Sequence, residues 1–333
     1  MTAHPEDYPA ASGPDVLVVG ESLVDIVSTT NGTTEHPGGS PANVAYGLGC
    51  LGVDTSLLTS IGGDRRGSVV ENHLARAGVR VLPGSRHPGR TATATATLTA
   101  EGSARYDFDI SWELPTAAPI VIPRIIHTGS IATFLAPGAT AVRALLEQPR
   151  PECMITYDPN IRPELLGTQA EARSMFEDLV PLTNVVKLSN EDAMWLYPGH
   201  SFDDVASRIL KLGAEMVAMT LGPGGSLLAT RTAKLFIPAI KCVVEDTIGA
   251  GDSYMAALIY GLLTGGTDGL APSQLTTIGH TAAMAAAITV GRAGASPPTA
   301  EELDAALTAH ASSAGIAGMA LPFGAGDGAP NGA

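Results

Sequence analysis

One short segment combines a carboxylate with a run of small residues and an apolar helix pattern. It reads Asp246-Thr247-Ile248-Gly249-Ala250-Gly251-Asp252, and a predicted helix follows from Tyr254 to Leu263. Small residues before a helix leave backbone N–H groups pointing outward at the positive end of the helix dipole, where a phosphate fits. Asp252 then stands at the helix start, where an ionised carboxylate could take the proton of a hydroxyl that attacks a phosphoryl group. The alternative is an Asp N-cap beside glycine turns.

A second copy of the last four residues tests how specific this segment is. Gly324-Ala325-Gly326-Asp327 repeats them near the C-terminus, with no helix pattern behind it. Four residues therefore do not define a site. The flanking Asp246-Thr247 and the long helix are what make the first copy specific.

A further candidate site combines paired glycines with an amide and a carboxylate. Gly38 and Gly39 precede a predicted helix that carries Asn43. Paired glycines let a ligand approach the backbone closely, and an asparagine offers a polyol both a donor and an acceptor. Asp25 follows the first predicted strand and could hydrogen-bond sugar hydroxyls. The alternatives are an ordinary turn before a helix and a solvated loop carboxylate.

Two common nucleotide-binding motifs are out of place or absent. The run from Gly47 to Gly52 matches G-x-G-x-x-G, but a dinucleotide fingerprint follows a strand and opens a helix. A helix pattern with Pro41 near its first turn precedes these glycines, so we expect them to close that helix. No Gly-Lys pair occurs in the chain, which excludes a Walker A loop.

The elements that must position these residues alternate between strands and helices. Apolar runs typical of strands buried on both faces of a parallel sheet occur at 16–19, 125–126, 153–157, 185–188 and 216–220. Helix-length segments such as 140–148 and 203–212 separate them, which predicts an α/β sheet with helices on both faces. Residues 91–99 and 104–110 alternate in polarity, which predicts an antiparallel hairpin serving as a lid or a dimerisation flap.

Composition and charge limit the class of protein. The chain has 333 residues, 45% of them hydrophobic and 16% charged, which is enough apolar material for a sizeable core. Its formal net charge of −14 repels phosphate backbones and anionic lipid, so we expect no nucleic acid or membrane partner. The longest apolar run, 282–290, is far below the roughly 20 residues of a membrane span. Three cysteines without a C-x-x-C pair, and no secretory signal, predict a cytoplasmic protein.

In combination the motifs resemble those of the PfkB-type, ribokinase-like family of sugar kinases, from about residue 15 to about residue 307. The N-terminal signature is similar to the stretch from Gly38 through Asn43 and on to Ile61-Gly62-Gly63-Asp64 and Gly67, and the C-terminal signature to 246–252. The resemblance implies a three-layer α/β/α sandwich with a mainly parallel central sheet and a small β-sheet lid. It also implies ATP as the phosphoryl donor, Mg²⁺, and K⁺ as a monovalent cation.

The resemblance, carried over position by position, gives roles to both candidate sites. The catalytic group that it implies is the base Asp252 with an anion hole formed by the amides of Gly249, Ala250 and Gly251. The sugar-binding residues that it implies are Asp25, Gly38, Gly39 and Asn43. The monovalent cation site that it implies includes Asp246 and the carbonyl of Ile248.

Two strand-to-loop segments extend the resemblance. Asp158-Pro159-Asn160-Ile161-Arg162-Pro163 resembles a segment common in the fructokinase and ketodeoxygluconate kinase branches, which implies that Arg162 lies near the acceptor or the transferring phosphate. A simple turn is the alternative. The segment from Lys187 to Glu191 resembles one whose acid acts on Mg²⁺ through water, which nominates Lys187 for the nucleotide and Glu191 for the metal. A capped helix start is the alternative there.

The remaining contacts implied by the resemblance depend mainly on backbone groups or on packing. The turn from Thr220 to Gly225 is similar to a T-x-G-x-x-G turn on the nucleotide side, which nominates the backbone of Thr220, Gly222 and Gly225; a hairpin turn is the alternative. Ala283 aligns with the family position beside the adenine, at which many ribokinases carry Asn or His. Tyr106 belongs to an aromatic lid segment that could cover a sugar face or form a subunit contact.

The acceptor and the domain limits complete the prediction. His127 is expected to be a packed strand-end residue, and its segment lacks the sugar-binding acid of ribokinases, which counts against ribose. We expect a disordered N-terminus at 1–14, a kinase domain at 15–310 with a lid at about 22–37 and 90–113, and a poorly ordered tail at 311–333. The predicted function is an ATP-dependent fructokinase. The alternatives are a 2-keto-3-deoxygluconate, ribose or nucleoside kinase and a non-catalytic sugar-binding regulator, and a homodimer through the lid is expected.

Overall fold

A nine-stranded sheet forms the centre of the computed structural model, which describes residues 13–29, 32–98, 104–114, 122–148, 152–265 and 270–313. Its order is β15-β14-β13-β12-β11-β10-β1-β4-β6; β14 and β15 pair antiparallel and the other strands pair parallel. The strands are β1 (Val16–Val19), β4 (Thr55–Leu58), β6 (Arg80–Val81), β10 (Ile125–Gly129), β11 (Met154–Asp158), β12 (Val185–Ser189), β13 (Met216–Thr220), β14 (Ser226–Thr230) and β15 (Lys234–Ile237). The mainly parallel sheet confirms the predicted architecture.

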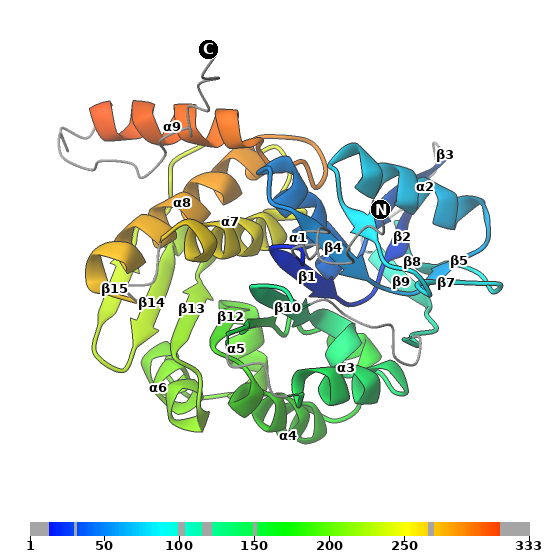
Figure 1. Cartoon of the computed structure of the whole chain (residues 1–333), viewed down its shortest axis with the longest axis horizontal. Helices are drawn as coiled ribbons and strands as arrows, with labels where there is room; N and C mark the ends of the chain where they lie inside the picture. The colour runs from blue at the N-terminus through cyan, green and yellow to red at the C-terminus, as the bar shows by residue number, and fades with distance from the viewer. Residues whose placement is uncertain are drawn as a thin grey trace, which may run out of the picture.

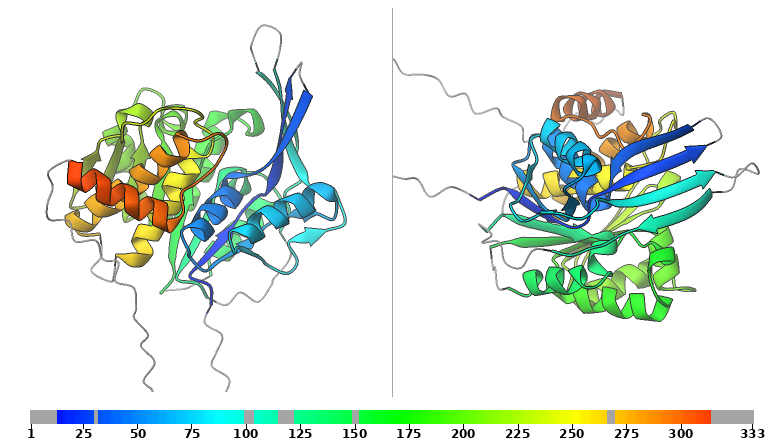
Figure 2. Two further views of the ribbon diagram at one scale, coloured as in Figure 1. Left: turned by 90° about the horizontal axis from the view of Figure 1, so that it is seen from above. Right: turned by 90° about the vertical axis from the view of Figure 1, so that its right-hand side faces the viewer.

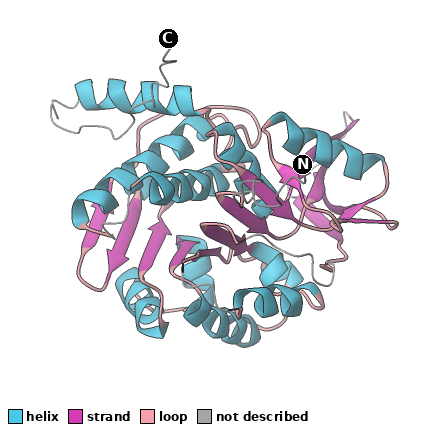
Figure 3. Cartoon of the chain, in the orientation of Figure 1, coloured by secondary structure: helices cyan, strands magenta, loops and turns pink. Residues whose placement is uncertain are grey.

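Helices cover both faces of this sheet (Figure 1). On one side lie α1 (Ser40–Cys50), α2 (Arg65–Arg76), α7 (Ala250–Thr264), α8 (Pro272–Val290) and α9 (Ala300–Ser313). On the other lie α3 (Gly138–Leu146), α4 (Gln169–Leu179), α5 (Asn190–Leu196) and α6 (Phe202–Leu212). Short 3-10 helices occur at Ser130–Thr133, Pro163–Leu165, Val180–Leu182 and Gly222–Gly224. Figure 3 shows the resulting helix, strand and helix layers.

The continuous apolar runs of the parallel strands explain the two helix layers. Successive side chains of a strand point to opposite faces of the sheet. Val16 and Val18 of β1 therefore pack into the hydrophobic cluster on the α1 and α7 side, and Leu17 and Val19 pack into the cluster on the α3 to α6 side. All four side chains are completely buried, which is why the sequence shows no alternation here.

A separate four-stranded sheet, which we call the lid, projects from one edge of the molecule (Figure 2). Its order is β3-β2-β8-β9, and its strands are β2 (Leu23–Thr29), β3 (Gly32–Gly38), β8 (Ala92–Leu98) and β9 (Ala104–Asp109). β8 and β9 pair antiparallel, as the alternating pattern predicted, and β8 also pairs parallel to β2. A two-stranded parallel sheet pairs β5 (Ile61–Gly62), which precedes α2 in the chain, with β7 (Arg86–His87), which follows it.

The structure corrects one helix boundary expected from the sequence. Gly47 and Gly49 do not close the helix after Pro41, because α1 continues to Cys50 and only Gly52, at φ 77°, follows it. A Cβ on Gly47 would lie 2.9 Å from the Cβ of Ala256, so this glycine lets α1 and α7 pack closely. The C-terminal helix α9 extends to Ser313. Residues 1–12 and 314–333, with the second Gly-Ala-Gly-Asp copy, lie outside the described residues.

Candidate active site

The candidate site lies where the strand order reverses. From β1 the chain continues to β4 on one side, and β10 pairs with β1 on the other, so the carboxyl ends of β1 and β10 flank a topological switch point. Open α/β sheets bind ligands in the crevice at this position. Asp158 ends β11 and Lys187 lies in the middle of the neighbouring strand β12, so parallel strands bring segments far apart in the sequence together there.

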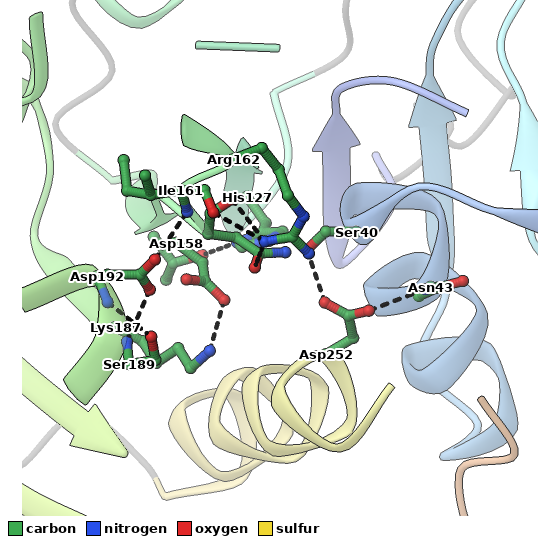
Figure 4. Close-up of polar contacts among 12 residues, drawn as sticks. Ser40, Asn43, His127, Asp158, Ile161, Arg162, Lys187, Ser189, Asp192 and Asp252 are labelled. Atoms are coloured by element: carbon green, nitrogen blue, oxygen red, sulfur yellow. Dashed lines mark hydrogen bonds and ion pairs between the residues drawn. The ribbon is translucent and has the colours of Figure 1, made fainter. Parts of the chain in front are cut away.

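Asp252 lies in the first turn of α7 and is held by two side chains of α1. Its Oδ1 accepts a hydrogen bond from Ser40 Oγ at 2.6 Å, and its Oδ2 accepts one from Asn43 Nδ2 at 2.8 Å. Figure 4 shows Asp252 turned toward α1 with both contacts. Asn43, predicted to bind the acceptor, and Ser40, which the sequence analysis missed, therefore orient the predicted base. The signal for Ser40 was its position directly after the paired glycines.

The start of α7 has the geometry of a tight glycine turn. Gly249 is the N-cap and adopts φ 76°, a left-handed conformation that favours glycine. The N–H of Ala250 donates to the Thr247 carbonyl at 3.3 Å, so this amide of the predicted anion hole has an internal partner. A Cβ on Gly251 would lie 3.2 Å from Lys187 Nζ, which places that ammonium directly beside the turn.

Asp25 on β2 faces this site from the lid. Burial raises the pKa of its carboxyl to about 6; Arg162 and His36 oppose the shift and Asp252 adds to it. These four charged groups therefore lie within electrostatic range of one another. A Cβ on Gly38 would overlap the Asp25 carboxylate, so only glycine fits there. Three of the four predicted acceptor residues, Asp25, Gly38 and Asn43, gather around Asp252, and Gly39 is the N-cap of α1 at φ 97°.

A buried ion pair lies under the start of α7. Lys187 Nζ is 2.8 Å from Asp158 Oδ2, and the two side chains are 4% and 1% exposed. Burial alone would lower the pKa of Lys187, but Asp158, Asp192 and Asp252 outweigh it and raise that pKa. Asp158 Oδ1 has no hydrogen-bond partner in the described residues. Lys187 is therefore a buried cation surrounded by more negative charge than it carries.

The loop after β11 and the start of α5 are joined by Asp192. Its Oδ1 accepts from the Ile161 N–H at 2.8 Å and its Oδ2 from the Ser189 N–H at 2.8 Å, and Ser189 completes a capping box. Asp192 is buried beside Lys187, whereas Glu191, the nominated metal residue, is exposed on the same turn. The acid that faces the cluster is thus one residue after the one predicted.

Arg162 supplies the exposed cation of the site. Its Nη1 donates to Asn160 Oδ1 at 2.8 Å and to the Ile161 carbonyl at 3.0 Å, so the guanidinium folds over its own loop. Asn160 adopts φ 37°, which bends the loop back toward the sheet. In Figure 4 Arg162 lies between Asp158 and Ser40. The segment is a turn, and it also brings Arg162 to the side of the site where Asp25 lies, so that its charge acts on Asp25.

The remaining predicted residues lie around this cluster. Asp246 accepts from the N–H groups of Ile248 and Gly294, both at 3.0 Å, so its carboxylate joins two loops near α7. Thr220 ends β13, and Gly222 and Gly225, at φ 54° and 93°, form the hairpin turn to β14. Ala283 lies half-buried in α8. Tyr106 lies on β9 opposite Ala96 in the register, and its side chain is outside the described residues.

Two buried titratable side chains, His127 and Glu21, lie near the site. The sequence predicted the first as a packed residue and did not single out the second. His127 is 1% exposed with Nδ1 3.0 Å from Thr156 Oγ1, which confirms that it is packed, although it lies in the middle of β10 and not at its end. Burial and Lys187 lower its pKa to about 3. Glu21, two residues after the end of β1, is buried, and burial raises its pKa to about 8. No helix in the described residues is long and apolar enough to span a bilayer.

Known proteins share this fold and these segments. An uncharacterized sugar kinase of Pyrococcus horikoshii is 28% identical over 309 residues, covering 86% of this chain and 94% of that protein. A fructokinase of Rhizobium leguminosarum bv. trifolii is 29% identical over 262 residues, covering 74% and 79%. The structure of Vibrio cholerae fructokinase, in fructose, ADP and calcium ion bound form, matches with a TM-score of 0.74 at 25% identity, covering 90% of this chain and 99% of the other.

The family match covers nearly all of the described chain. The model of the pfkB family carbohydrate kinases aligns with residues 14–302, which include the lid, the Gly38-Gly39 turn and the Asp252 helix. With the ribokinase-like sheet and its lid, this match identifies the chain as a carbohydrate kinase and a member of the PfkB family.

Proposed function

We propose that the chain is an ATP-dependent fructokinase that transfers the γ-phosphate of ATP to a fructose hydroxyl. The observation that carries the proposal is the position of Asp252 at the N-terminus of α7, hydrogen-bonded by Ser40 and Asn43 and faced by Asp25 of the lid. Relatives and structural neighbours named fructokinase support the choice of acceptor.

In the proposed mechanism Asp252 takes the proton of the acceptor hydroxyl. The hydroxyl oxygen forms a bond to the γ-phosphorus as the bond to the bridging oxygen of ADP breaks, so the products are a sugar phosphate, ADP and one proton, held first on Asp252. Ser40 and Asn43 fix the direction of the carboxylate before the acceptor arrives. Proton acceptance by a positioned carboxylate contributes about 10² to 10⁴ in rate.

Two positive features would stabilise the negative charge that moves during transfer. The α7 dipole directs its positive end at the turn from Gly249 to Gly251, and Lys187 Nζ lies beside Gly251. An anion at this turn would compete with the Thr247 carbonyl for the Ala250 amide. Charge stabilisation by such preorganised groups is strong because water is excluded from the site.

The residues also fit the expected cations. The described residues hold no group of three His, Cys, Asp or Glu side chains that could bind a metal, which suits Mg²⁺, an ion held mainly by substrate phosphates, water and one or two carboxylates. Glu191, the exposed acid in the first turn of α5, is the carboxylate that we propose for Mg²⁺. Bound Mg²⁺ would neutralise phosphate charge. Asp246 and the Ile248 carbonyl offer oxygen atoms suited to K⁺.

A second acceptor class, an acidic sugar such as 2-keto-3-deoxygluconate, is favoured by one observation. Arg162 acts electrostatically on both Asp25 and Glu21, so a cation lies on the acceptor side of the site. A sugar carboxylate would pair with this guanidinium, whereas neutral fructose needs only hydrogen bonds.

The test is ADP release from ATP and Mg²⁺ with fructose, 2-keto-3-deoxygluconate, ribose, adenosine or no acceptor, each with and without K⁺. We expect fructose to give turnover well above the blank, and Asp252→Asn to lower kcat by about 10²-fold or more while ATP still shifts the melting temperature. Glu301→Gln, an exposed acid on α9, is the matched charge control. Turnover only with the acidic sugar, lost in Arg162→Met, would replace fructose by that acceptor. Near-normal turnover of Asp252→Asn would exclude Asp252 as the base.

A further inference from the structure

Two ends of the lid are attached to one peptide group of the core. The chain enters the lid through Glu21 and Ser22, which precede β2, and leaves it after β9 through Trp112. Glu21 Oε2 accepts a hydrogen bond from the Ala132 N–H at 3.1 Å. Trp112 Nε1 donates to the Ala132 carbonyl at 3.0 Å. The two lid ends, about 90 residues apart in sequence, thus bind the N–H and C=O of the same residue.

These hydrogen bonds are shielded from water. Glu21 and Trp112 are each 3% exposed, and Ala132 is completely buried. Hydrogen bonds in such surroundings are not exchanged for bonds to solvent, so breaking one leaves a buried group unsatisfied. Burial keeps Glu21 protonated at neutral pH, since its pKa is raised to about 8 despite the hydrogen bonds from Ser130 and Ala132 and the charge of Arg162. A neutral amide is therefore a close substitute for it.

The shared peptide belongs to a rigid turn. Ala132 lies in the 3-10 helix Ser130–Thr133 that follows β10 at the switch point. Ser130 adopts φ 53°, and Thr133 Oγ1 donates to the Ser130 carbonyl at 2.9 Å, which fixes the shape of this turn. An added Cβ on Gly20 would lie 3.4 Å from the Ala132 Cβ, so the end of β1 also packs against it. The lid is attached to a part of the core that cannot move easily.

Each lid end has a further anchor. Ser22 Oγ accepts from Thr59 Oγ1 at 2.9 Å, which ties the entry to the residue after β4. The Trp112 carbonyl accepts from the Gly138 N–H at 3.1 Å, and a Cβ at position 138 would overlap the indole. Trp112 is thus held both by its side chain and by its backbone.

The attachment sets where Asp25 lies. Asp25 is four residues beyond Glu21, about 13 Å along the strand at about 3.3 Å per residue. A rotation of about 5° at the lid root then moves Asp25 by about 1 Å, a displacement that can cost about 10² in rate at a reacting site. A small rotation of the lid at Glu21 therefore produces a larger displacement of Asp25.

We propose that Glu21 and Trp112 are positioning residues that pin the lid to the Ala132 peptide and so hold Asp25 over the acceptor. The effect on the acceptor rests on the proposed function. The attachment itself does not, because it is a property of the protein without ligand. The two parts can therefore be tested separately.

The first test needs no substrate. Amide hydrogen exchange is measured on the full chain, wild type and with Glu21→Ala, Glu21→Gln or Trp112→Phe, and Tyr197→Phe, which removes the part-buried hydrogen bond from Tyr197 to Glu177, is the control. We expect Glu21→Ala and Trp112→Phe to speed exchange in β2 and β8 about tenfold, with β12 unchanged. Glu21→Gln should retain the slow exchange. Equally faster exchange in the lid strands and in β12, or unchanged exchange in the lid, would contradict the proposed attachment.

The second test is kinetic and uses whichever acceptor gives turnover. Loss of one buried hydrogen bond in Glu21→Ala or Trp112→Phe should raise the acceptor KM about tenfold, leave the ATP KM within about twofold, and be restored in Glu21→Gln. The double variant should be no worse than the poorer single, because both act through one peptide. Additive losses, or equal changes in both KM values, would contradict the positioning role.

Outcomes for the two proposals are distinguishable. If no acceptor gives turnover but the lid exchange changes as expected, the function proposed above fails and the attachment stands. If Glu21→Ala does not fold, Trp112→Phe, which retains an aromatic ring but loses the indole N–H and the five-membered ring, is measured against Glu21→Gln, which keeps the acceptor, and faster lid exchange in Trp112→Phe alone supports the attachment.

Discussion

Asp252 shows how a single carboxylate is given a direction by residues of another helix. Both donors, Ser40 and Asn43, lie more than 200 positions earlier in the chain, at separations of 212 and 209 residues. A free aspartate in the first turn of a helix would cap its own backbone N–H groups. Here both oxygens are turned to α1, so the carboxylate faces the space between the two helices.

Asp25 leads to a pH-dependent prediction. Burial raises its pKa to about 6, above the ordinary value of 3.8, so the carboxyl gains a proton as the pH falls through about 6. The protonated form loses charge-assisted hydrogen bonds to sugar hydroxyls. We therefore expect the acceptor KM to rise below about pH 6 while the ATP KM stays constant, measured as a pH profile.

Two variants test the assignment of this titration. Asp25→Asn should remove the acidic limb of the acceptor profile. His36→Gln should move the limb to higher pH, because His36 lowers the pKa of Asp25 together with Arg162, against Asp252. A limb that survives in Asp25→Asn belongs to another group.

At the scale of elements, Asp64 joins the start of α2 to the base of β8. Its Oδ1 accepts from the Gly67 N–H at 2.8 Å and from Thr91 Oγ1 at 2.6 Å, and its Oδ2 accepts from the Thr91 N–H at 3.1 Å. An added Cβ on Gly62 would overlap the backbone at Arg90 and Thr91. This part of the family signature therefore holds a lid strand in place.

Asp64→Ala should lower the free energy of unfolding by about 1–2 kcal/mol, the usual loss for an N-cap, measured by urea denaturation. Burial opposes ionisation, but the hydrogen bonds from Thr91 and Gly67 outweigh it and lower the pKa from 3.8 to about 2. The stabilisation is thus complete above about pH 4 and lost toward pH 2, so the difference between wild type and variant should shrink as the pH falls.

The control for Asp64 is a cap that does not hold the lid. Ser201→Ala removes the N-cap of α6, whose Oγ accepts from the Asp204 N–H at 3.1 Å and donates to Asp204 Oδ2 at 2.6 Å, so any pH dependence of its effect follows Asp204 and does not involve the lid. If Asp64→Ala loses as much unfolding free energy at low pH as at pH 7, ionisation of Asp64 does not contribute to stability.

At the scale of the whole molecule, the site depends on how closely α1 and α7 approach. Gly47 of α1 faces Ala256 of α7, and both helices carry site residues about one turn earlier, Asn43 and Asp252. Two small residues at this crossing let the helix axes approach. The distance between the Asp252 carboxylate and its donors is therefore set by packing away from the site.

Gly47→Val should separate the two helices and weaken the Ser40 and Asn43 contacts to Asp252. We expect overpacking to cost about 1–3 kcal/mol in unfolding free energy, with kcat falling more than the ATP KM rises. Calorimetry and steady-state kinetics measure the two effects. Gly291→Ala, at φ −78° with 3.5 Å to the nearest atom, is the matched control and should change neither. Unchanged kcat in a destabilised Gly47→Val protein would show that the helix spacing does not position Asp252.

The sequence by itself determined the layers, the lid hairpin and the turn at Gly249 to Asp252, because these follow from local hydrophobic periodicity and glycine chemistry. It did not determine which acid of α5 faces the cluster. Adjacent helix residues differ by about 100° in direction, so Asp192 rather than Glu191 is buried beside Lys187 only once the helix is docked. Gly47 and Gly49 were misread because a glycine used for packing has the same local pattern as one that ends a helix.

Tertiary structure alone decided the contacts between distant segments. Ser40 with Asp252, Lys187 with Asp158, and the two lid ends on Ala132 all join residues on different strands or helices. Such contacts depend on strand order, register and helix rotation, which are fixed by burial of the two hydrophobic clusters together and not by any local run of residues. The chemistry was therefore visible in the residues, and its geometry was set by the core.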